Sequence, residues 1–272
     1  FLGSPVFVGN WAVNQKAVTP SASGLTKVYD GTTQASLVTG AITATGVTVN
    51  GVPETASVTQ TTGTYNDKNV ANANTVTATL QASHFTSGTA DVGNYNLPTT
   101  VSNTASSITK ANLAVTLAKQ TKVYDGTTAA SPSLVITSGL IGAETLNVAG
   151  TASFNTKNVA TANLVTVNTT SLTDGNNGGL ASNYSLNSGQ TVAASITPAA
   201  LTASVAAPNK VYDGTVTAAP TMTITAGLVG AETLNVASTA SFNTKNVATA
   251  NLVTVNTTSL TDGNNGGLAS NY

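Results

Sequence analysis

Short runs of alternating apolar and polar residues follow one another along the whole chain, and stretches rich in Asn, Gly and Ser separate them. Val, Thr, Leu and Ala dominate the runs, and β-branched side chains favour strands. Asn, Gly and Ser favour turns. The pattern therefore predicts strands over residues 35–39, 42–49, 56–61, 74–80, 113–117, 134–137, 146–154, 164–172 and 184–196.

The hexapeptide Lys-Val-Tyr-Asp-Gly-Thr occurs three times, at residues 27–32, 122–127 and 210–215. Val-Tyr is typical of a strand, and Asp-Gly of a tight turn in which Gly takes a positive φ and Asp accepts a hydrogen bond from a following N–H. We expect the Tyr ring to cover the core, with its hydroxyl bonded to backbone. The residues of this turn motif are Lys27, Tyr29, Asp30, Gly31, Lys122, Tyr124, Asp125, Gly126, Lys210, Tyr212, Asp213 and Gly214. A binding triad of Lys, Tyr and Asp is the alternative, although turn chemistry already accounts for Asp and Gly.

The motif lysines are 95 and then 88 positions apart, so the chain is a tandem array. We predict repeats at residues 21–109, 110–197 and 198–272, and residues 239–272 copy residues 151–184 without a change. The third repeat ends at Asn-Tyr, and we expect it to lack a closing strand equivalent to residues 185–197. An absent strand exposes unpaired backbone groups that another strand can fill.

Residues 1–20 precede the first full repeat. Their end, residues 17–20, resembles residues 195–198 at the end of the second repeat, which predicts the closing strand of a preceding or neighbouring unit. Phe7, Trp11 and Val13 fall on one parity, as a half-buried strand requires. Together with Val18 they form a candidate donor strand.

Composition narrows the possible functions. Charged residues make up 7% of the chain, the net charge is −1, and every basic residue is Lys. Without Arg or a basic patch, the chain lacks the usual means of binding nucleic acid. There is no Cys, hence neither a disulfide framework nor a thiol site, and no apolar run long enough to span a membrane. We expect no cofactor and no catalytic residues.

The repeated elements resemble the YDG-domain family, the β-rich repeats of bacterial surface proteins of the filamentous-haemagglutinin type. The resemblance rests on Lys-Val-Tyr-Asp-Gly-Thr, the later Lys-Asn-Val, Asn-Tyr-x-Leu, and Ile-Thr-x-Ala-x-Leu at residues 196–201. It implies an exported bacterial protein whose tandem β-domains form a stalk or fibre. The approach to the second Asn-Tyr, at residues 173–179, departs from the shorter family pattern.

Two weaker possibilities concern metal binding and covalent crosslinking. Asp174 and Asp262 lie in Asp-Gly-Asn-Asn-Gly-Gly loops, which supply oxygen ligands for calcium but only one carboxylate each. We interpret these loops as ordinary turns. Each repeat also has one Glu, namely Glu54, Glu144 and Glu232, which is the acid that an intramolecular Lys–Asn or Lys–Asp crosslink would need.

The sequence therefore predicts an all-β fold, a tandem array of small β-sandwich-like (Ig-like) domains. We expect a non-enzymatic stalk or fibre of an extracellular bacterial adhesin at the cell surface, whose partners are other copies of itself, flanking repeats, or a host or neighbouring cell. One alternative is a filament subunit joined head-to-tail, with residues 1–19 of one copy completing the third repeat of the next. Another is a glycan- or protein-binding module, which would display clustered aromatic residues.

Overall fold

The computed structural model describes residues 9–10, 12–187 and 189–272, and these residues form strands, loops and four short 3-10 helices. This confirms the predicted all-β class. No helix in the described part of the chain is long and apolar enough to cross a membrane.

Short strands joined by loops make up each repeat. The first repeat contains β1 Lys16–Ala17, β2 Thr19–Ala22, β3 Thr26–Val28, β4 Gln34–Ser36, β5 Ile42–Val49, β6 Val52–Val58, β7 Thr62–Tyr65, β8 Val76–Thr79, η1 Ala82–His84, β9 Phe85–Ser87, η2 Val92–Asn94, β10 Tyr95–Asn96, β11 Thr100–Asn103 and β12 Ser107–Thr109. The second contains β13 Ala111–Leu117, β14 Gln120–Val123, β15 Ala129–Ala130, β16 Leu134–Ser138, β17 Leu146–Phe154, β18 Leu164–Asp174, η3 Ala181–Asn183, β19 Tyr184–Leu186 and β20 Thr191–Thr197. The third contains β21 Thr202–Ala206, β22 Thr217–Ala218, β23 Thr221–Ala226, β24 Leu234–Phe242, β25 Val253–Asp262 and η4 Ala269–Asn271.

The chain divides into two compact units whose limits differ from those of the repeats. One unit consists of Phe1–Ala114, Ser138–Asn147 and Thr173–Leu186, and the other of Val115–Thr137, Val148–Leu172 and Asn187–Tyr272. The first unit thus holds the first repeat together with two segments of the second. The second unit holds the rest of the second repeat and all of the third.

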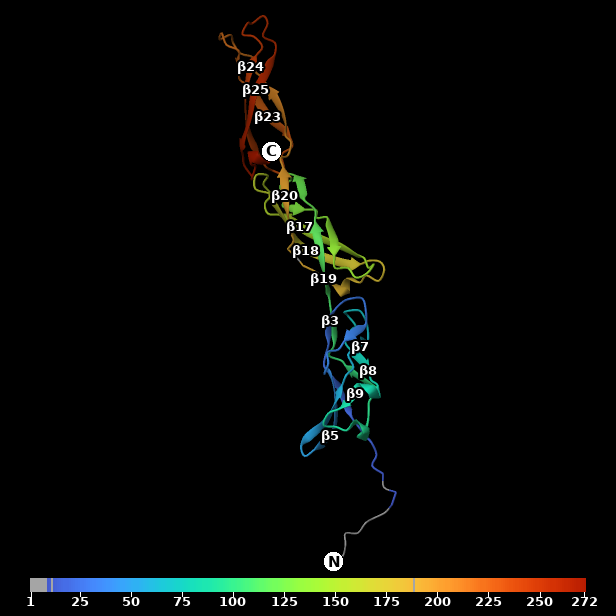
Figure 1. The fold of residues 1–272 in the computed structure, drawn as a ribbon. Coiled ribbons are helices and arrows are strands. Elements are labelled where there is room, and N and C mark those ends of the chain that lie inside the picture. Colours follow the sequence, from blue (N-terminus) through green and yellow to red (C-terminus); the bar gives the residue numbers. More distant parts are fainter. Residues whose placement is uncertain (1–8, 11, 188) are drawn as a thin grey trace, which may run out of the picture. The chain divides into compact units, whose positions relative to one another are not determined.

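The first unit contains two four-stranded antiparallel sheets, ordered β2-β5-β6-β9 and β11-β8-β7-β4. Burial alternates along their strands, as in β4 and β8, so that one face of each strand is covered. The buried side chains from both sheets are small or β-branched, with a few large rings; they include Ala35, Ile42, Ala44, Ala56, Val58, Tyr65, Val76, Ala78, Phe85 and Val101. Strands of the first sheet, β5 and β9, and of the second, β7 and β8, are labelled in Figure 1.

β5 and β6 form a long hairpin that is closed by a two-residue turn. β5 and β6 pair antiparallel up to Val49 and Val52, and the two residues between them are Asn50 and Gly51. Their φ angles are 51° and 82°. Asn-Gly with positive φ at both positions is the favoured two-residue hairpin turn, because its twist matches that of the flanking strands.

In the second unit, the five-stranded sheet β14-β20-β18-β17-β15 depends on β20. β20 pairs parallel with β14 on one side and antiparallel with β18 on the other. It thereby links the strand that leads into the turn motif to the long strands of the repeat. Its inward side chains join a core cluster made of Tyr124, Ala152, Phe154, Ala162, Val165, Ala194, Ile196 and Ala199.

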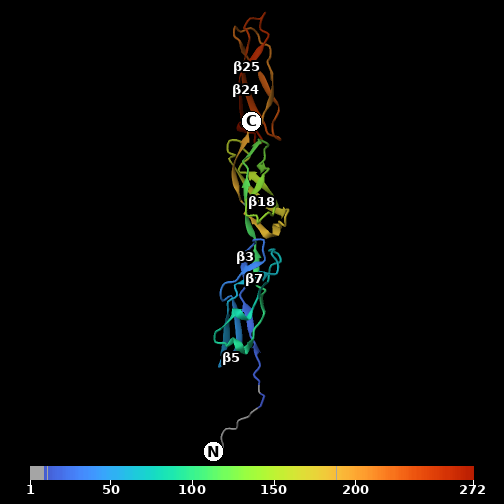
Figure 2. The ribbon, with the colours of Figure 1, turned by 45° about the vertical axis from the view of Figure 1, so that its right-hand side comes forward.

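The third repeat has no counterpart of β20 among the described residues. Its strands form the sheets β21-β23 and β22-β24-β25. β24 and β25 run side by side, coloured red to orange at the end of the sequence, in both Figure 1 and Figure 2. Lys210 and Val211, which correspond to β14 residues, are therefore in no strand. This agrees with the expectation that the closing strand is missing.

The structure differs from the sequence-based expectations at the start of the first repeat and within the last predicted strand of the second. Residues 17–20 align by register with the opening strand of a repeat, because Lys16 pairs with Tyr95 as Ala111 pairs with Tyr184. β1 and β2 therefore belong to the first repeat rather than to a preceding unit. The strand predicted over residues 184–196 is interrupted between β19 and β20, where Gly189 has a φ of 82°. The other repeat boundaries stay predictions.

Candidate functional site at the junction between repeats

The turn motif forms a closed local network around its lysine. Lys27 Nζ donates to Asp30 Oδ1 at 2.7 Å and to the carbonyl oxygens of Thr32 and Gln34 at 2.9 Å. Asp30 Oδ1 also accepts the Thr32 N–H at 2.9 Å, and Gly31 has a φ of 78°. These are the turn interactions expected from Asp-Gly. The lysine is thus committed to its own loop rather than directed toward a ligand.

The same network recurs in the other two repeats. Lys122 Nζ lies 2.7 Å from Asp125 Oδ1 and Lys210 Nζ lies 2.8 Å from Asp213 Oδ1. The hydrogen bond from Lys210, followed by those from Thr215, lowers the pKa of Asp213 to about 2. The aspartates therefore stay ionised and keep the turns closed at neutral pH.

The tyrosine of the motif reaches the next repeat. Tyr29 is 2% exposed, and its hydroxyl donates to Glu144 Oε1 at 2.7 Å rather than to backbone as expected. Tyr184 donates to the other carboxylate oxygen, Glu144 Oε2, at 2.6 Å. The two rings meet edge to face, with centroids 5.4 Å apart and an interplanar angle of 78°. One buried carboxylate is therefore shared by tyrosines of two successive repeats.

The second unit contains the same arrangement. Tyr124 donates to Glu232 Oε1 and Tyr272 to Glu232 Oε2, both at 2.7 Å. Lys157 Nζ adds an ion pair at 3.4 Å to Glu232 Oε1. The rings of Tyr124 and Tyr272 are 5.5 Å apart at 77°. We call each such set a Tyr–Glu–Tyr junction. It consists of the Tyr of a turn motif, the Glu of the next repeat, and the Tyr of the Asn-Tyr motif in that next repeat.

Burial and charge fix which groups donate. Desolvation, together with the hydrogen bond to its glutamate, raises the pKa of Tyr124 and of Tyr184 to about 12 each. Desolvation acts to raise the pKa of Glu232, but the hydrogen bonds from Tyr272, Tyr124 and Lys157 outweigh it and lower that pKa. Tyr124 and Tyr184 therefore remain protonated donors and Glu232 an ionised acceptor. Hydrogen bonds to an ionised group are the stronger kind.

Each junction also contains a buried asparagine. Asn183 is fully buried; its Oδ1 accepts the Val70 N–H at 2.9 Å, and its Nδ2 donates to Asn69 Oδ1 at 2.9 Å. Asn271 bonds to Val159 and Asn158 in the same way. The Asn-Tyr and Lys-Asn-Val motifs, far apart in each repeat, are thus the two sides of one contact.

Apolar contacts complete the fit. A Cβ built on Gly31 would lie 3.0 Å from Ile141 Cγ2, and one on Gly126 would lie 2.9 Å from Val229 Cγ1. The motif glycine therefore serves both the positive φ and the close approach of the next repeat. The N–H groups of Ile141 and Val229 donate to the hydroxyls of Tyr184 and Tyr272.

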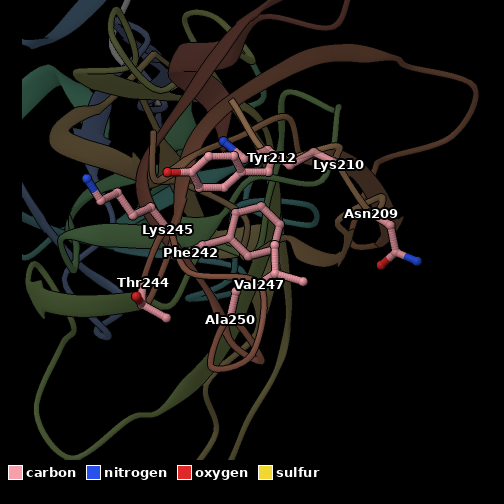
Figure 3. A pocket seen from close by; sticks show the side chains of 8 residues that line it. All are labelled: Asn209, Lys210, Tyr212, Phe242, Thr244, Lys245, Val247 and Ala250. Carbon is pink, nitrogen blue, oxygen red and sulfur yellow. The ribbon is translucent and has the colours of Figure 1, made fainter. Parts of the chain in front are cut away.

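The third turn motif lies open instead. Tyr212 is 58% exposed, against 3% for Tyr124, and in the described part of the chain its hydroxyl has no hydrogen-bond partner. A pocket of about 170 Å³ borders it, lined by Asn209, Lys210, Tyr212, Phe242, Thr244, Lys245, Val247 and Ala250. Figure 3 shows the Tyr212 and Phe242 rings and Val247 grouped at its centre, with Lys245 and Asn209 to opposite sides.

The other predicted residues are not brought together into a site. The Asp174 carboxylate accepts the Ala181 N–H at 2.7 Å and that of Asp262 accepts the Ala269 N–H at 2.8 Å, which closes each loop on itself. Over the described residues no cluster of three His, Cys, Asp or Glu side chains offers a metal site. For a crosslink, the motif lysines face Asp, while Glu144 and Glu232 face tyrosines.

The candidate donor-strand residues differ in where they lie and in how far they are buried. Phe7 and Trp11 lie outside the described residues. Val18 is buried within the first unit, in the strand register that Leu113 occupies in the second repeat. Val13 is fully exposed.

The glutamates are the functional residues whose role sequence reasoning missed. A signal was present: Glu144 and Glu232 each precede the tyrosine that they bind by 40 positions, and Glu54 precedes Tyr95 by 41. A spacing that differs by only one position among three repeats indicates that each Glu has the Tyr of its own repeat as partner. Nothing in the sequence shows that a second tyrosine, from the previous repeat, takes the other oxygen.

A family model described as "YDG domain" matches residues 14–103, 109–192 and 197–272. Neither the search of curated proteins nor the search of solved structures found a match to the chain.

Proposed function

Because the chain belongs to the YDG domain family, with three tandem copies, we propose that it is a structural repeat protein. In this proposal it forms the stalk or fibre of an extracellular bacterial adhesin or filament and carries out no catalysis. The observation that supports it most is the Tyr–Glu–Tyr junction, built twice with the same atoms at nearly the same distances. Repeats joined by buried hydrogen bonds suit a protein whose task is to span distance.

The polar groups of the motif support this role because they are used within the protein. Lys27 donates to four acceptors in its own loop, and Glu144 is held by two tyrosines. A catalytic or binding triad would leave such groups directed at a substrate.

Immunogold labelling of intact source cells, with antibody raised against residues 21–109, tests this function. We expect label at and beyond the cell surface without permeabilisation. Small-angle scattering of the purified chain measures its radius of gyration and so tests the proposed stalk. A stalk is expected to give a radius of gyration well above the roughly 18 Å of a compact protein of this length. Label confined to the cell interior, or a compact particle, would overturn the proposal.

The donor-strand alternative is favoured by one observation and narrowed by another. The third repeat lacks a counterpart of β20 among its described residues, so a strand from another copy has a place to bind. Residues 16–22, however, already pair within the first repeat. The donor segment is therefore limited to residues before Lys16, and a truncation meant to test it should begin at Lys16.

The glycan- or protein-binding alternative rests on the Tyr212 pocket, which has two aromatic rings and polar neighbours. The equivalent surfaces of the first two repeats are covered by the following repeat. This makes a protein occupant the better explanation of the exposed ring. A glycan array probed with the full chain, with Tyr212→Ala as control, distinguishes the two.

A further inference from the structure

The first repeat presents one half of a junction without the other. Tyr95 donates its hydroxyl to Glu54 Oε2 and accepts the Val47 N–H, as Tyr184 does with Glu144 and Ile141. Glu54 Oε1, the oxygen that a motif tyrosine takes in the other repeats, has no partner in the described part of the chain.

The asparagine beside it is free as well. Asn94 occupies the place of Asn183, but it is exposed, and its side chain makes no hydrogen bond to any described residue. Its counterparts Asn183 and Asn271 are completely buried. The Glu54 end, defined by Val47, Glu54, Asn94 and Tyr95, therefore has the Glu and Asn acceptors of a junction, but among the described residues it lacks the motif tyrosine and the Val N–H that donate to them.

The third repeat presents the complementary half. The Tyr212 hydroxyl and the Val247 N–H, whose counterparts Tyr124 and Val159 bond to Glu232 and Asn271, have no partners in the residues described. Val247 and Leu252 are also strongly exposed. We call the surface around Tyr212, Asn246, Val247 and Leu252 the Tyr212 end.

We propose that the Tyr212 end of one molecule binds the Glu54 end of a second copy of this chain, so that a third Tyr–Glu–Tyr junction forms between molecules. This rests on the proposed structural role and names its partner. Tyr212 donates to Glu54 Oε1, and the Val247 N–H donates to Asn94 Oδ1. Asn94 Nδ2 donates to Asn246 Oδ1, and Val47 packs against Gly214, where a Cβ now meets nothing within 4 Å.

The strand register supplies a second, independent argument. Lys16 pairs with Tyr95 as Ala111 pairs with Tyr184, so Val13 stands three residues before the junction, as Ile108 does. Ile108 and its counterpart Ile196 are buried in the core of the repeat that precedes the junction, whereas Val13 is fully exposed.

Docking of the Glu54 end would bring Val13 to the third repeat of the other molecule. There it fills the place that Ile196 takes in the second repeat, alongside Lys210 and Val211. Ala12, Val13 and Asn14 then give Lys210 and Val211 backbone hydrogen bonds of the kind that β14 receives from β20. Closing strand and junction are thus completed by the same contact.

The two surfaces are different, so the contact is heterologous and head-to-tail, and it continues into open assemblies rather than closed dimers. Sedimentation velocity of the full chain over a wide concentration range, with negative-stain microscopy, measures this. We expect concentration-dependent growth into linear oligomers. Tyr212→Phe removes one hydrogen bond to a carboxylate and is expected to weaken association by about ten- to a hundredfold.

Blocking variants test the geometry. Val13→Asp and Tyr212→Asp each place a carboxylate in one half of the contact and are expected to abolish growth. Val38→Asp, at another exposed valine, is the matched control and leaves growth unchanged. An equimolar mixture of Val13→Asp and Tyr212→Asp molecules retains one intact pair of ends and is expected to form heterodimers and nothing larger.

A chain that stays monomeric at every concentration overturns this inference, as does growth that the Val13 and Tyr212 variants leave unchanged. If circular dichroism shows that both single variants are folded and the mixture nevertheless forms no heterodimers, the head-to-tail geometry is wrong. The structural role is tested separately, by immunogold labelling and by the radius of gyration, and does not depend on these results.

Discussion

Tyr29 of the first repeat donates its hydroxyl to Glu144 of the second, a residue 115 positions further along the chain, at 2.7 Å. Tyr184 holds the other oxygen of that carboxylate. The two contacts are matched in the second unit and half-formed at Tyr95 and Tyr212. Because the chain contains occupied and open versions of one site, most predictions have an internal control.

Tyr124→Phe should destabilise the protein by about 1.5–3 kcal/mol, because it removes a hydrogen bond to the buried Glu232 carboxylate. Tyr212→Phe, measured under conditions in which the chain is monomeric, should change stability by less than about 0.5 kcal/mol, since its hydroxyl bonds to no described residue. Urea unfolding followed by tyrosine fluorescence gives both values. Equal effects of the two substitutions would contradict the shared carboxylate.

Asn183→Ala should lower stability by about 1–3 kcal/mol, because the buried Val70 N–H loses its acceptor. Hydrogen exchange by mass spectrometry should show loss of protection in the peptide that contains Val70. Asn94→Ala is the control at the exposed equivalent position. In this variant, protection of the peptide that contains Val70 should remain as in the wild type. Unchanged protection in Asn183→Ala would show that this bond does not hold the junction.

Gly126→Ala should be more destabilising than Gly214→Ala. Both glycines have positive φ, 76° and 74°, which disfavours a Cβ by roughly 1 kcal/mol at either site. Only at Gly126 would the new Cβ also meet a side chain, Val229 Cγ1 at 2.9 Å. Thermal unfolding measures the difference between the two variants, which reports the contact with the next repeat. If Gly214→Ala melted at a lower temperature than Gly126→Ala, the contact between residue 126 and Val229 would be refuted.

Stability should be nearly constant from about pH 7 to about pH 5 and should fall below about pH 4. The pKa values of Asp213 and Glu232 are lowered in the folded protein, Asp213 to about 2. A carboxyl with a lowered pKa stabilises the fold above its unfolded pKa, and this stability is lost as the pH falls through the folded pKa.

Calorimetry over this pH range gives the curve. Glu232→Gln should melt at a lower temperature near neutral pH and should depend less steeply on pH in the acid range than the wild type. A melting temperature that rises on acidification would contradict the pKa directions.

The intact mass of the purified chain should equal its sequence mass, without the loss of water or ammonia that a lysine crosslink would cause. Each motif lysine is held by Asp and by backbone carbonyls, and Glu144 and Glu232 bind tyrosines. A lighter mass in high-resolution mass spectrometry would show that a crosslink exists elsewhere.

Local chemistry was predictable from the sequence. Asp-Gly defines the turn at Asp30 and Gly31, and the strands at residues 42–49 and 146–154 coincide with β5 and β17. These features depend on neighbouring residues, whose preferences the sequence displays directly. The lack of a β20 counterpart among the described residues of the third repeat was also predictable, because one repeat could be compared with another.

Partners from different repeats were not predictable. The Tyr29 hydroxyl was expected to bond to backbone, because a buried hydroxyl requires an acceptor but does not identify it. Residues 17–20 were assigned to a closing strand because Ser-Ile-Thr-Pro and Ala-Val-Thr-Pro have the same alternation, whereas the pairing of Lys16 with Tyr95 decides the alignment. Both errors concern contacts between segments that are distant in the sequence.

The shared glutamate also bears on how such chains change in length. Every junction draws one tyrosine from the repeat before it and a glutamate with the second tyrosine from the repeat after it. Recombination that adds or deletes one whole period therefore creates a new boundary whose two halves already match. Residues 151–184 and 239–272 are identical, and each contains the second tyrosine of a junction, Tyr184 in one and Tyr272 in the other. A gene of this kind can be lengthened or shortened in a single step while each buried carboxylate keeps both of its donors.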